Sequence, residues 1–191
     1  MVNKENNNRY SEQVLWYSSP AKNFNESLPL GNGRIGACVY GGIEEDTVSL
    51  NEETLWSGYP NQLHDENYSE IYEKIGKLTS ENKIAEAQRL SEEKFGGELG
   101  QMYLPLGKLK IKSYHNGVIT DYSRMLFLDE AIQNISYICG QKEYHREYFI
   151  SKPDEVMAIH FSCSQPGCVS FEVFFDTQLN AEIFCKKNVC A

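Results

Sequence analysis

The amino-acid sequence predicts a mainly β protein: a large antiparallel β-sandwich, expected to be incomplete, with a two-helix insertion near residues 65–95. Short β-prone segments separated by turn residues occupy most of the chain, and only the central segment repeats its apolar residues in steps of three and four. The alternation of strand and helix that is typical of a parallel sheet is absent. With 191 residues, 41% hydrophobic and 24% charged, the chain has the composition and length of about one globular domain.

The first part of the chain predicts an arm followed by strands. Residues 1–13 are polar and rich in Asn, so we expect a flexible arm, and we expect the sandwich domain to cover residues 14–176. A short β-prone segment covers residues 14–20. Within residues 28–50, two apolar stretches flank the sequence Gly-Gly-Ile-Glu-Glu-Asp, which predicts a hairpin with glycines at its turn or bulge. We expect strand structure to continue toward Trp56.

The central segment predicts two amphipathic helices. Its apolar residues follow steps of three and four and are Tyr68, Ile71, Tyr72, Ile75, Leu78, Ile84, Ala87, Leu90 and Phe95. Ser80 is a suitable N-cap for the second helix, and Gly96-Gly97 is a suitable end for it.

The C-terminal half returns to alternating patterns. Residues 108–112 alternate Lys with apolar residues, and Gln165-Pro166-Gly167 has the composition of a turn. Further strands are predicted over residues 134–139, 142–150, 155–163 and 168–176. We interpret residues 177–191 as a divergent or truncated tail.

Composition excludes several classes of partner. The net charge is -9, from 18 basic and 27 acidic residues with no basic cluster, so we expect no nucleic-acid partner. No run approaches the roughly 20 apolar residues that cross a bilayer, and the N-terminus has no apolar signal core. We therefore expect a cytoplasmic protein that binds no membrane, with six free cysteines and unmodified sequons at Asn25, Asn67 and Asn134.

The residues 31–36 fit the pattern G-x-G-x-x-G, and Glu52 and Glu53 follow about 20 residues later. A dinucleotide site needs a helix that begins at these glycines, because its amides hold the pyrophosphate. The sequence that follows is strand-like instead, so we favour a tight β-loop and expect no cofactor.

Metal ligands and an acid–base pair are not evident. Two cysteine pairs with four intervening residues, Cys163/Cys168 and Cys185/Cys190, give only a weak zinc pattern, and we expect no metal. Glu143, His145 and Glu147 fall on one face of a predicted strand, which a solvated surface explains equally well. Glu52 and Glu53 are adjacent and would point to opposite faces of a strand.

Three parts of the sequence resemble one enzyme family. They are PAKNFNESLPLGNGRIGACVYGG (residues 20–42), LNEETLWSGYP (50–60), and the pair YLPLGKLKI (103–111) and REYFISKPDEV (146–156). In this order they resemble the N-terminal domain of glycoside hydrolase family 95, the inverting α-L-fucosidases, some of which act on α-L-galactosides. The similarity extends from about Val14 to Asp176. Phe24 stands where members commonly carry Trp, which keeps an aromatic ring.

The resemblance implies a β-sandwich that is followed by a helical linker, an (α/α)₆ barrel and a small C-terminal β domain. The catalytic Glu and the water-activating Asn and Asp of the family lie in that barrel, so the resemblance assigns no catalytic residue to this chain. It also implies the barrel as partner and a fucosylated glycan as substrate of the intact enzyme. The family's sandwich is longer than this chain and the similarity stops after Asp176, so we expect a truncated or frameshifted gene whose product alone is inactive and marginally stable.

Five residues of the resembling segments are candidates to face the substrate or the barrel: Asn32, Arg34, Asn51, Glu52 and Trp56. The alternative is that Arg34 and Glu52 form an internal salt bridge and that Trp56 fills the core. A different class of function, a stand-alone carbohydrate-binding or barrel-docking module, also fits a sandwich rich in aromatic residues. Binding modules usually display exposed aromatics, whereas Trp16 and Trp56 lie in apolar segments.

Overall fold

The computed structural model describes residues 13–58, 68–95, 101–186 and 189–190. The chain divides into two compact units, one formed by residues 1–55 with 105–191 and the other by residues 56–104. Most of the arm predicted over residues 1–13, and the helix end predicted at Gly96-Gly97, lie outside the described residues.

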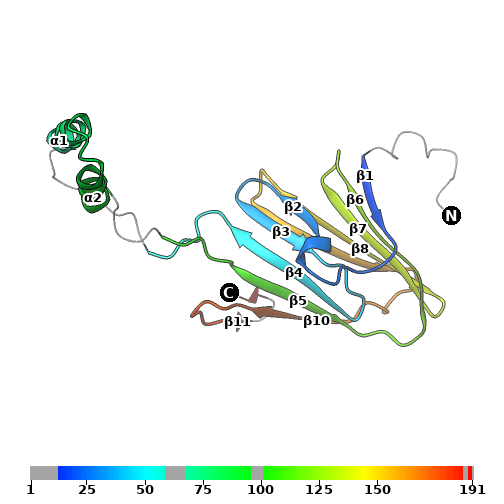
Figure 1. Ribbon diagram of the computed structural model, residues 1–191. Coiled ribbons are helices and arrows are strands. Elements are labelled where there is room, and N and C mark those ends of the chain that lie inside the picture. The colour runs from blue at the N-terminus through cyan, green and yellow to red at the C-terminus, as the bar shows by residue number, and fades with distance from the viewer. Residues whose placement is uncertain (1–12, 59–67, 96–100, 187–188, 191) are drawn as a thin grey trace. The chain divides into compact units, whose positions relative to one another are not determined.

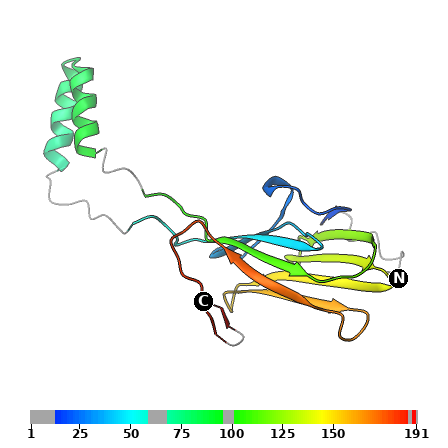
Figure 2. The ribbon, with the colours of Figure 1, turned by 90° about the horizontal axis from the view of Figure 1, so that it is seen from below.

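The first unit is a sandwich of two five-stranded antiparallel sheets (Figure 1). The first sheet has the order β1-β6-β7-β8-β9, from β1 (Val14–Tyr17), β6 (Ile119–Phe127), β7 (Ile132–Cys139), β8 (Lys142–Ser151) and β9 (Val156–Cys163). The second sheet has the order β10-β5-β4-β3-β2, from β2 (Leu28–Gly31), β3 (Ile35–Val39), β4 (Glu45–Glu52), β5 (Gly107–Ser113) and β10 (Phe171–Asp176). Figure 2 shows β10 beside β5 at the edge of the second sheet.

Shorter elements complete this unit. A 3₁₀ turn (Phe24–Glu26) precedes β2, and β11 (Cys185–Lys186) pairs with β12 (Val189–Cys190) near the C-terminus. The sandwich prediction is confirmed.

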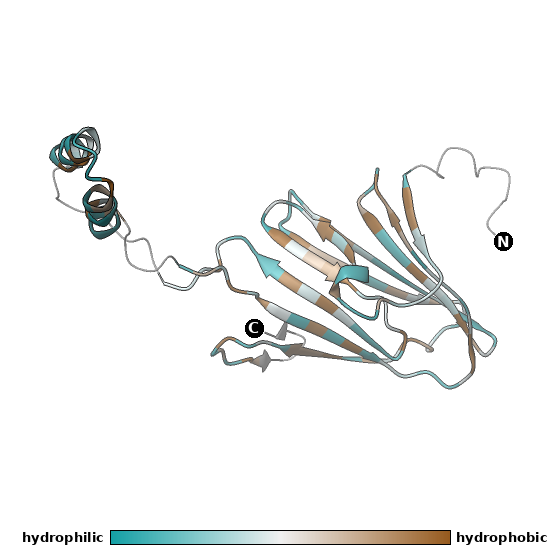
Figure 3. Cartoon of the chain, in the orientation of Figure 1, coloured by the Kyte–Doolittle hydropathy of each residue, from teal (hydrophilic) through white to brown (hydrophobic). Residues whose placement is uncertain are grey.

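Alternation along the strands builds the core. In β7, every second residue from Gln133 to Cys139 is buried and the intervening residues are partly exposed. Figure 3 shows hydrophobic and hydrophilic residues interleaved along the strands of both sheets. Val39 and Val48 of the second sheet are fully buried and belong to the same core cluster as Ile135 of the first. Burying an aliphatic side chain of this size stabilises the fold by roughly 1.5–3 kcal/mol.

Several strand predictions require correction. The strand β6 was not expected, because its register shifts between Thr120 and Ser123 and Asp121 adopts a positive φ of 52°, which breaks the alternation. The strand β4 ends at Glu52 and does not continue to Trp56, whose backbone forms only an isolated bridge with Tyr103.

The second unit contains α1 (Tyr68–Ser80) and α2 (Ile84–Phe95), as the spacing of apolar residues predicts. Aromatic rings pair between the helices, with the ring centroids of Tyr72 and Phe95 4.8 Å apart. The prediction that Ser80 caps α2 is wrong. Ser80 is the last residue of α1, and its hydroxyl donates to the carbonyl oxygen of Lys77 (2.8 Å), so it stabilises the end of the first helix instead.

Candidate functional site

One end of the sandwich brings together three connections: the β2–β3 turn, the residues that follow β4, and the β8–β9 turn. The G-x-G-x-x-G segment forms the first of these as the turn of a β-hairpin, with Gly31 paired to Gly36. Gly33, with φ 98°, supplies a conformation that favours glycine. The expectation of a tight β-loop is therefore confirmed, and the strand–helix context of a dinucleotide site is not what these residues form.

Asn32 shapes this turn and joins the two sheets. Its Oδ1 accepts hydrogen bonds from the backbone amides of Arg34 (3.0 Å) and Ile35 (2.8 Å), which fixes the reversal of the chain. Its Nδ2 donates to the carbonyl oxygen of Ser151 (3.0 Å), the last residue of β8 in the opposite sheet. Asn32 is thus a connection between the sheets at this end.

Arg34 is held between two carboxylates. Its Nε donates to Glu52 at 3.0 Å, and its Nη1 contacts Glu155 of the β8–β9 turn. The hydroxyl and amide of Thr54 donate to Glu52 at 2.6 and 2.9 Å. These Thr54 bonds and the Arg34 contact lower the pKa of Glu52 and keep it ionised. Glu155, which sequence reasoning missed, adopts a positive φ of 52° in this turn.

The five candidate residues are therefore not all assembled. Asn32, Arg34 and Glu52 lie together. Asn51 is the residue before Glu52 on β4 and pairs with Gly36 of β3. Trp56 belongs to the second unit, where its ring packs edge-on against Tyr103 with a centroid distance of 5.1 Å.

The alternative for these residues was an internal Arg34–Glu52 salt bridge and a Trp56 ring in the core, and only part of it is confirmed. The Arg34–Glu52 salt bridge is confirmed, although the Arg34 side chain is 50% exposed, so the bridge is not internal. The idea that Trp56 fills the core is wrong, because its side chain is 49% exposed. A pair this exposed contributes little stability, about 0–1 kcal/mol.

The face of β8 that carries Glu143, His145 and Glu147 is a solvated surface, which is one of the two interpretations of the sequence pattern. Glu143 and His145 are exposed and contact each other at 3.2 Å, and Glu147 follows on the same face. Among the described residues, no group of three His, Cys, Asp or Glu is placed to hold a metal ion. In the same part of the chain, no helix is long and apolar enough to span a membrane. The described cysteines Cys38, Cys139, Cys163 and Cys168 are free thiols.

Sequence reasoning missed a buried polar network at the opposite end of the sandwich. Asp46, the last residue of the Gly-Gly-Ile-Glu-Glu-Asp segment, is completely buried. One of its oxygens accepts the backbone amides of Gly41 (2.7 Å), Gly42 (2.9 Å) and Thr47 (2.8 Å). The other accepts the hydroxyl of Tyr148, from the opposite sheet, at 2.6 Å. Burial raises the pKa of the Asp46 carboxyl, and these donors counteract the shift.

Arg146 of β8 is the second member of this network, and its side chain is 1% exposed. It lies 3.7 Å from Asp46. It donates to the carbonyl oxygens of Gly42 and Ile43 at 2.6 Å each, and to the hydroxyls of Ser113 and Tyr137 at 3.0 Å each. Charge-assisted hydrogen bonds from Arg146 of the first sheet therefore hold the β3–β4 turn of the second sheet in place.

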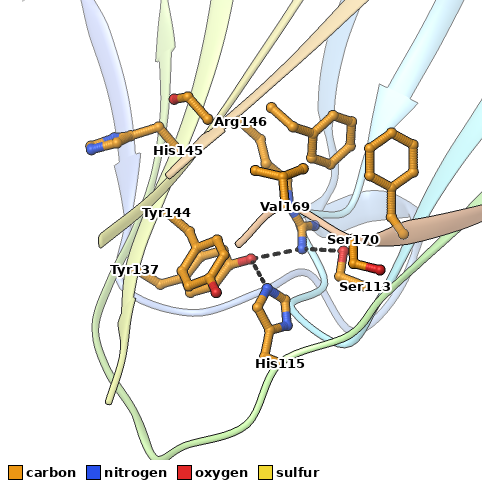
Figure 4. Close-up of a pocket in the computed structure, with 11 residues that line it drawn as sticks. Ser113, His115, Tyr137, Tyr144, His145, Arg146, Val169 and Ser170 are labelled. Atoms are coloured by element: carbon orange, nitrogen blue, oxygen red, sulfur yellow. Dashed lines mark hydrogen bonds between the residues drawn. The ribbon is translucent and has the colours of Figure 1, made fainter. Parts of the chain in front are cut away.

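Arg146 also lines a pocket at this end (Figure 4). The Tyr137 and Tyr144 rings stack with centroids 5.4 Å apart, and the His115 ring meets both edge-on. His115 Nε2 lies 2.7 Å from the Tyr137 hydroxyl. His145 points away from this cluster.

A signal for this network was present in the sequence. If Glu143, His145 and Glu147 face solvent, the alternation of β8 places Tyr144, Arg146 and Tyr148 in the core. An arginine at a core position requires a carboxylate or several acceptors, so the pattern of β8 indicates a buried partner such as Asp46.

The chain is similar to known proteins over most of its length. Residues 15–191 match the protein family described as glycosyl hydrolase family 65, N-terminal domain. The chain is 32% identical to "Alpha-L-fucosidase 2" of Arabidopsis thaliana over 169 residues, which is 87% of this chain and 20% of the relative. It is 30% identical to "Probable alpha-fucosidase A" of Aspergillus niger over 162 residues, which is 78% of this chain and again 20% of the relative. The chain thus spans a fifth of the length of these relatives.

Proposed function

Because the chain belongs to the family described as glycosyl hydrolase family 65, N-terminal domain, we propose that it is the non-catalytic N-terminal sandwich of an α-L-fucosidase-like enzyme. The observation that carries this proposal is the similarity to proteins named as α-fucosidases over one fifth of their length. The polar residues at the two ends of the sandwich form ion pairs and hydrogen bonds with one another, as expected of a domain with a structural role.

The finer assignment is to family 95. We propose that in the intact enzyme the sandwich packs on an (α/α)₆ barrel that hydrolyses α-L-fucosides with inversion. The support is the resemblance of residues 20–42, 50–60, 103–111 and 146–156 to that family. The matched family description carries the number 65 and does not name family 95, so membership of family 95 is part of this proposal.

We propose that the end of the sandwich that carries Asn32 and Arg34 faces the barrel. Arg34 is half exposed and pairs with both Glu52 and Glu155, so it offers a polar group at this end of the sandwich. Asn51, the pairing partner of Gly36, is a further candidate for this surface. Trp56, with its half-exposed ring, belongs to the second unit and is a separate candidate to contact the barrel.

Enzyme assays test the proposal. The chain alone should hydrolyse an aryl α-L-fucoside no faster than buffer. A chain joined to the rest of a family 95 enzyme should release fucose as the inverted anomer, which NMR of the first product detects. In that fusion, Arg34→Ala should lower the melting temperature or kcat, whereas Lys142→Ala, at the other end of β8, should not. Fucosidase activity of the isolated chain would contradict the proposal.

One observation favours the alternative of a carbohydrate-binding module. The apolar context of Trp16 and Trp56 argued against exposed aromatics, yet Trp16 is 60% exposed and Trp56 is 49% exposed. Calorimetric titration with fucosylated oligosaccharides tests this alternative. Binding that Trp16→Ala abolishes, and that Phe24→Ala does not, would support it, and an absence of heat would exclude it.

A further inference from the structure

The sequence contains two Asn-Gly pairs, Asn32-Gly33 and Asn116-Gly117. In such a pair, the backbone nitrogen of the glycine can attack the side-chain amide carbon of the asparagine, because the glycine has no side chain to obstruct the approach. The first pair lies in the β2–β3 turn and the second in the loop between β5 and β6, at the other end of the sandwich. The surroundings of each pair determine whether it reacts.

The Asn32 side chain is held at both of its polar atoms. Its Oδ1 accepts the backbone amides of Arg34 (3.0 Å) and Ile35 (2.8 Å), and its Nδ2 donates to the carbonyl oxygen of Ser151 (3.0 Å). The residue is also partly buried. Attack by the Gly33 nitrogen requires the amide to turn away from these partners, so the folded chain protects Asn32.

Asn116 and Gly117 have no such restraint. Both residues are exposed. Within the part of the chain that the structure describes, neither the Asn116 side chain nor the Gly117 amide forms a hydrogen bond. The Asn116 amide can therefore change rotamer and bring its carbon toward the Gly117 nitrogen without the loss of a bond.

The residues on either side of this pair are anchored to the sandwich. Nε2 of His115 lies 2.7 Å from the Tyr137 hydroxyl, and the carbonyl oxygen of Val118 accepts the amide of Gly140 at 3.0 Å. An exposed segment without hydrogen bonds fluctuates at little cost in free energy. The motion that the reaction needs is thus confined to the pair itself and requires neither strand to open.

We propose that Asn116 is a site of spontaneous deamidation in the folded chain and that Asn32 is protected from it. The Gly117 nitrogen loses its proton and forms a bond to Cγ of Asn116, the bond from Cγ to Nδ2 breaks, and ammonia leaves. Water then opens the resulting succinimide at either carbonyl group and gives aspartate or isoaspartate, so no oxidant or cofactor takes part.

Each event replaces a neutral amide with a carboxylate in the loop that carries His115. The proposal does not rest on the proposed function, because the reaction uses only this chain and water.

Peptide mapping by mass spectrometry, after the whole chain has been incubated at mildly alkaline pH, tests the proposal. Trypsin places the two pairs in separate peptides, residues 23–34 and 113–124, and Asn116 is the single asparagine of the second peptide. We expect aspartate and isoaspartate to form at Asn116 at least about tenfold faster than at Asn32, since hydrogen bonds must break at Asn32 first.

Unfolding in urea removes the protection, so the two pairs should then react at similar rates. Asn116→Gln keeps an amide but lengthens the side chain, which disfavours the cyclic imide, and it should remove most of the isoaspartate that the folded chain forms. Asn180→Gln is the matched control, because Asn180 is exposed and precedes an alanine, and it should leave the isoaspartate unchanged. Equal rates at Asn32 and Asn116 in the folded chain, or an Asn116 that reacts only after unfolding, would overturn the proposal.

Discussion

Asp46 joins the two sheets through one carboxylate, which holds three amides of its own hairpin and the Tyr148 hydroxyl of the opposite sheet. Asp46→Ala removes the carboxylate beside the buried Arg146 guanidinium and leaves that charge uncompensated. We expect the free energy of unfolding to fall by about 3–5 kcal/mol, as for other buried pairs that lose one partner. Urea denaturation followed by circular dichroism measures the change.

Asp129→Ala is the matched control, because Asp129 is exposed in the turn between β6 and β7. A surface substitution of this kind should change the free energy of unfolding by no more than about 0.5 kcal/mol. If Asp46→Ala costs less than about 1 kcal/mol, the network around Arg146 does not stabilise the sandwich in the way its geometry indicates.

His115 gives a pH dependence whose sign follows from its surroundings. Burial and the Arg146 charge lower the pKa of His115 in the folded protein, and a smaller effect of Glu44 opposes them. The unfolded chain therefore binds a proton at a pH where the folded protein does not, near 6.5 and below. The stability that the neutral ring contributes is fully present above about pH 7 and is lost as the pH falls through this range.

The measurement is the melting temperature of the wild type and of His115→Phe between pH 8 and pH 5. We expect the wild type to lose more stability over this range than the variant, since other titrating groups are common to both. His160→Phe should follow the wild-type curve. Parallel curves for the wild type and His115→Phe would show that His115 titrates alike in the folded and unfolded states.

At the scale of single elements, the β3–β4 hairpin has no room at its glycines. A Cβ added to Gly42 would lie 1.9 Å from the carbonyl oxygen of Glu45, so the backbone would have to move. We expect Gly42→Ala to lower the free energy of unfolding by at least about 3 kcal/mol. Gly140 is the matched control, because it has a positive φ of 64° and no atom within 4 Å of its Cβ position.

Gly140→Ala should cost only the strain of the left-handed conformation, about 1 kcal/mol. Thermal or urea unfolding of the two variants side by side decides between a steric and a merely conformational role of the hairpin glycines. Equal losses in the two variants would mean that the hairpin relaxes around the added methyl group.

These elements also show how far the sequence can predict the structure. Segments with regular periods, such as α1 and β7, were predictable, because the partly buried residues of α1 recur in steps of three and four and every second residue of β7 is buried. The strand β6 was not, since the bulge at Asp121 interrupts its alternation and the pairing with β1 and β7 compensates for it. Ser80 was misplaced because a hydroxyl can serve either helix end, and only the chain path decides which.

In the candidate site, contacts within one hairpin could be predicted from the sequence more easily than contacts between the two sheets. Arg34 and Glu52 were predictable as a pair because β3 and β4 form a hairpin that sets Ile35 opposite Glu52. Glu155 lies 121 positions from Arg34, and its approach depends on how the two sheets stack. The contact of Asp46 with Tyr148 depends on the same stacking, which a single sequence does not encode in any local pattern.

For the whole molecule, the division into two units predicts that the helical unit is dispensable for the sandwich. The strands β4 and β5 are neighbours, with Leu50 opposite Gly107, so a short glycine linker can replace residues 56–104. We expect this deletion to remove the helical signal in circular dichroism and to shift the melting temperature of the sandwich by less than about 5 °C. Loss of the cooperative melting transition would contradict the division.

The edge strand β10 predicts self-association of the isolated chain. It pairs with β5 along one edge, and Phe171, Val173 and Phe174 are between 41% and 50% exposed. An apolar strand at a sheet edge is a template for pairing with another chain, and a lysine on it disfavours that pairing. Phe174→Lys should therefore reduce the association seen in sedimentation velocity as protein concentration rises. Phe24→Lys alters an equally exposed ring away from the edge and should have no such effect, so equal reductions would assign the association to exposed aromatics in general.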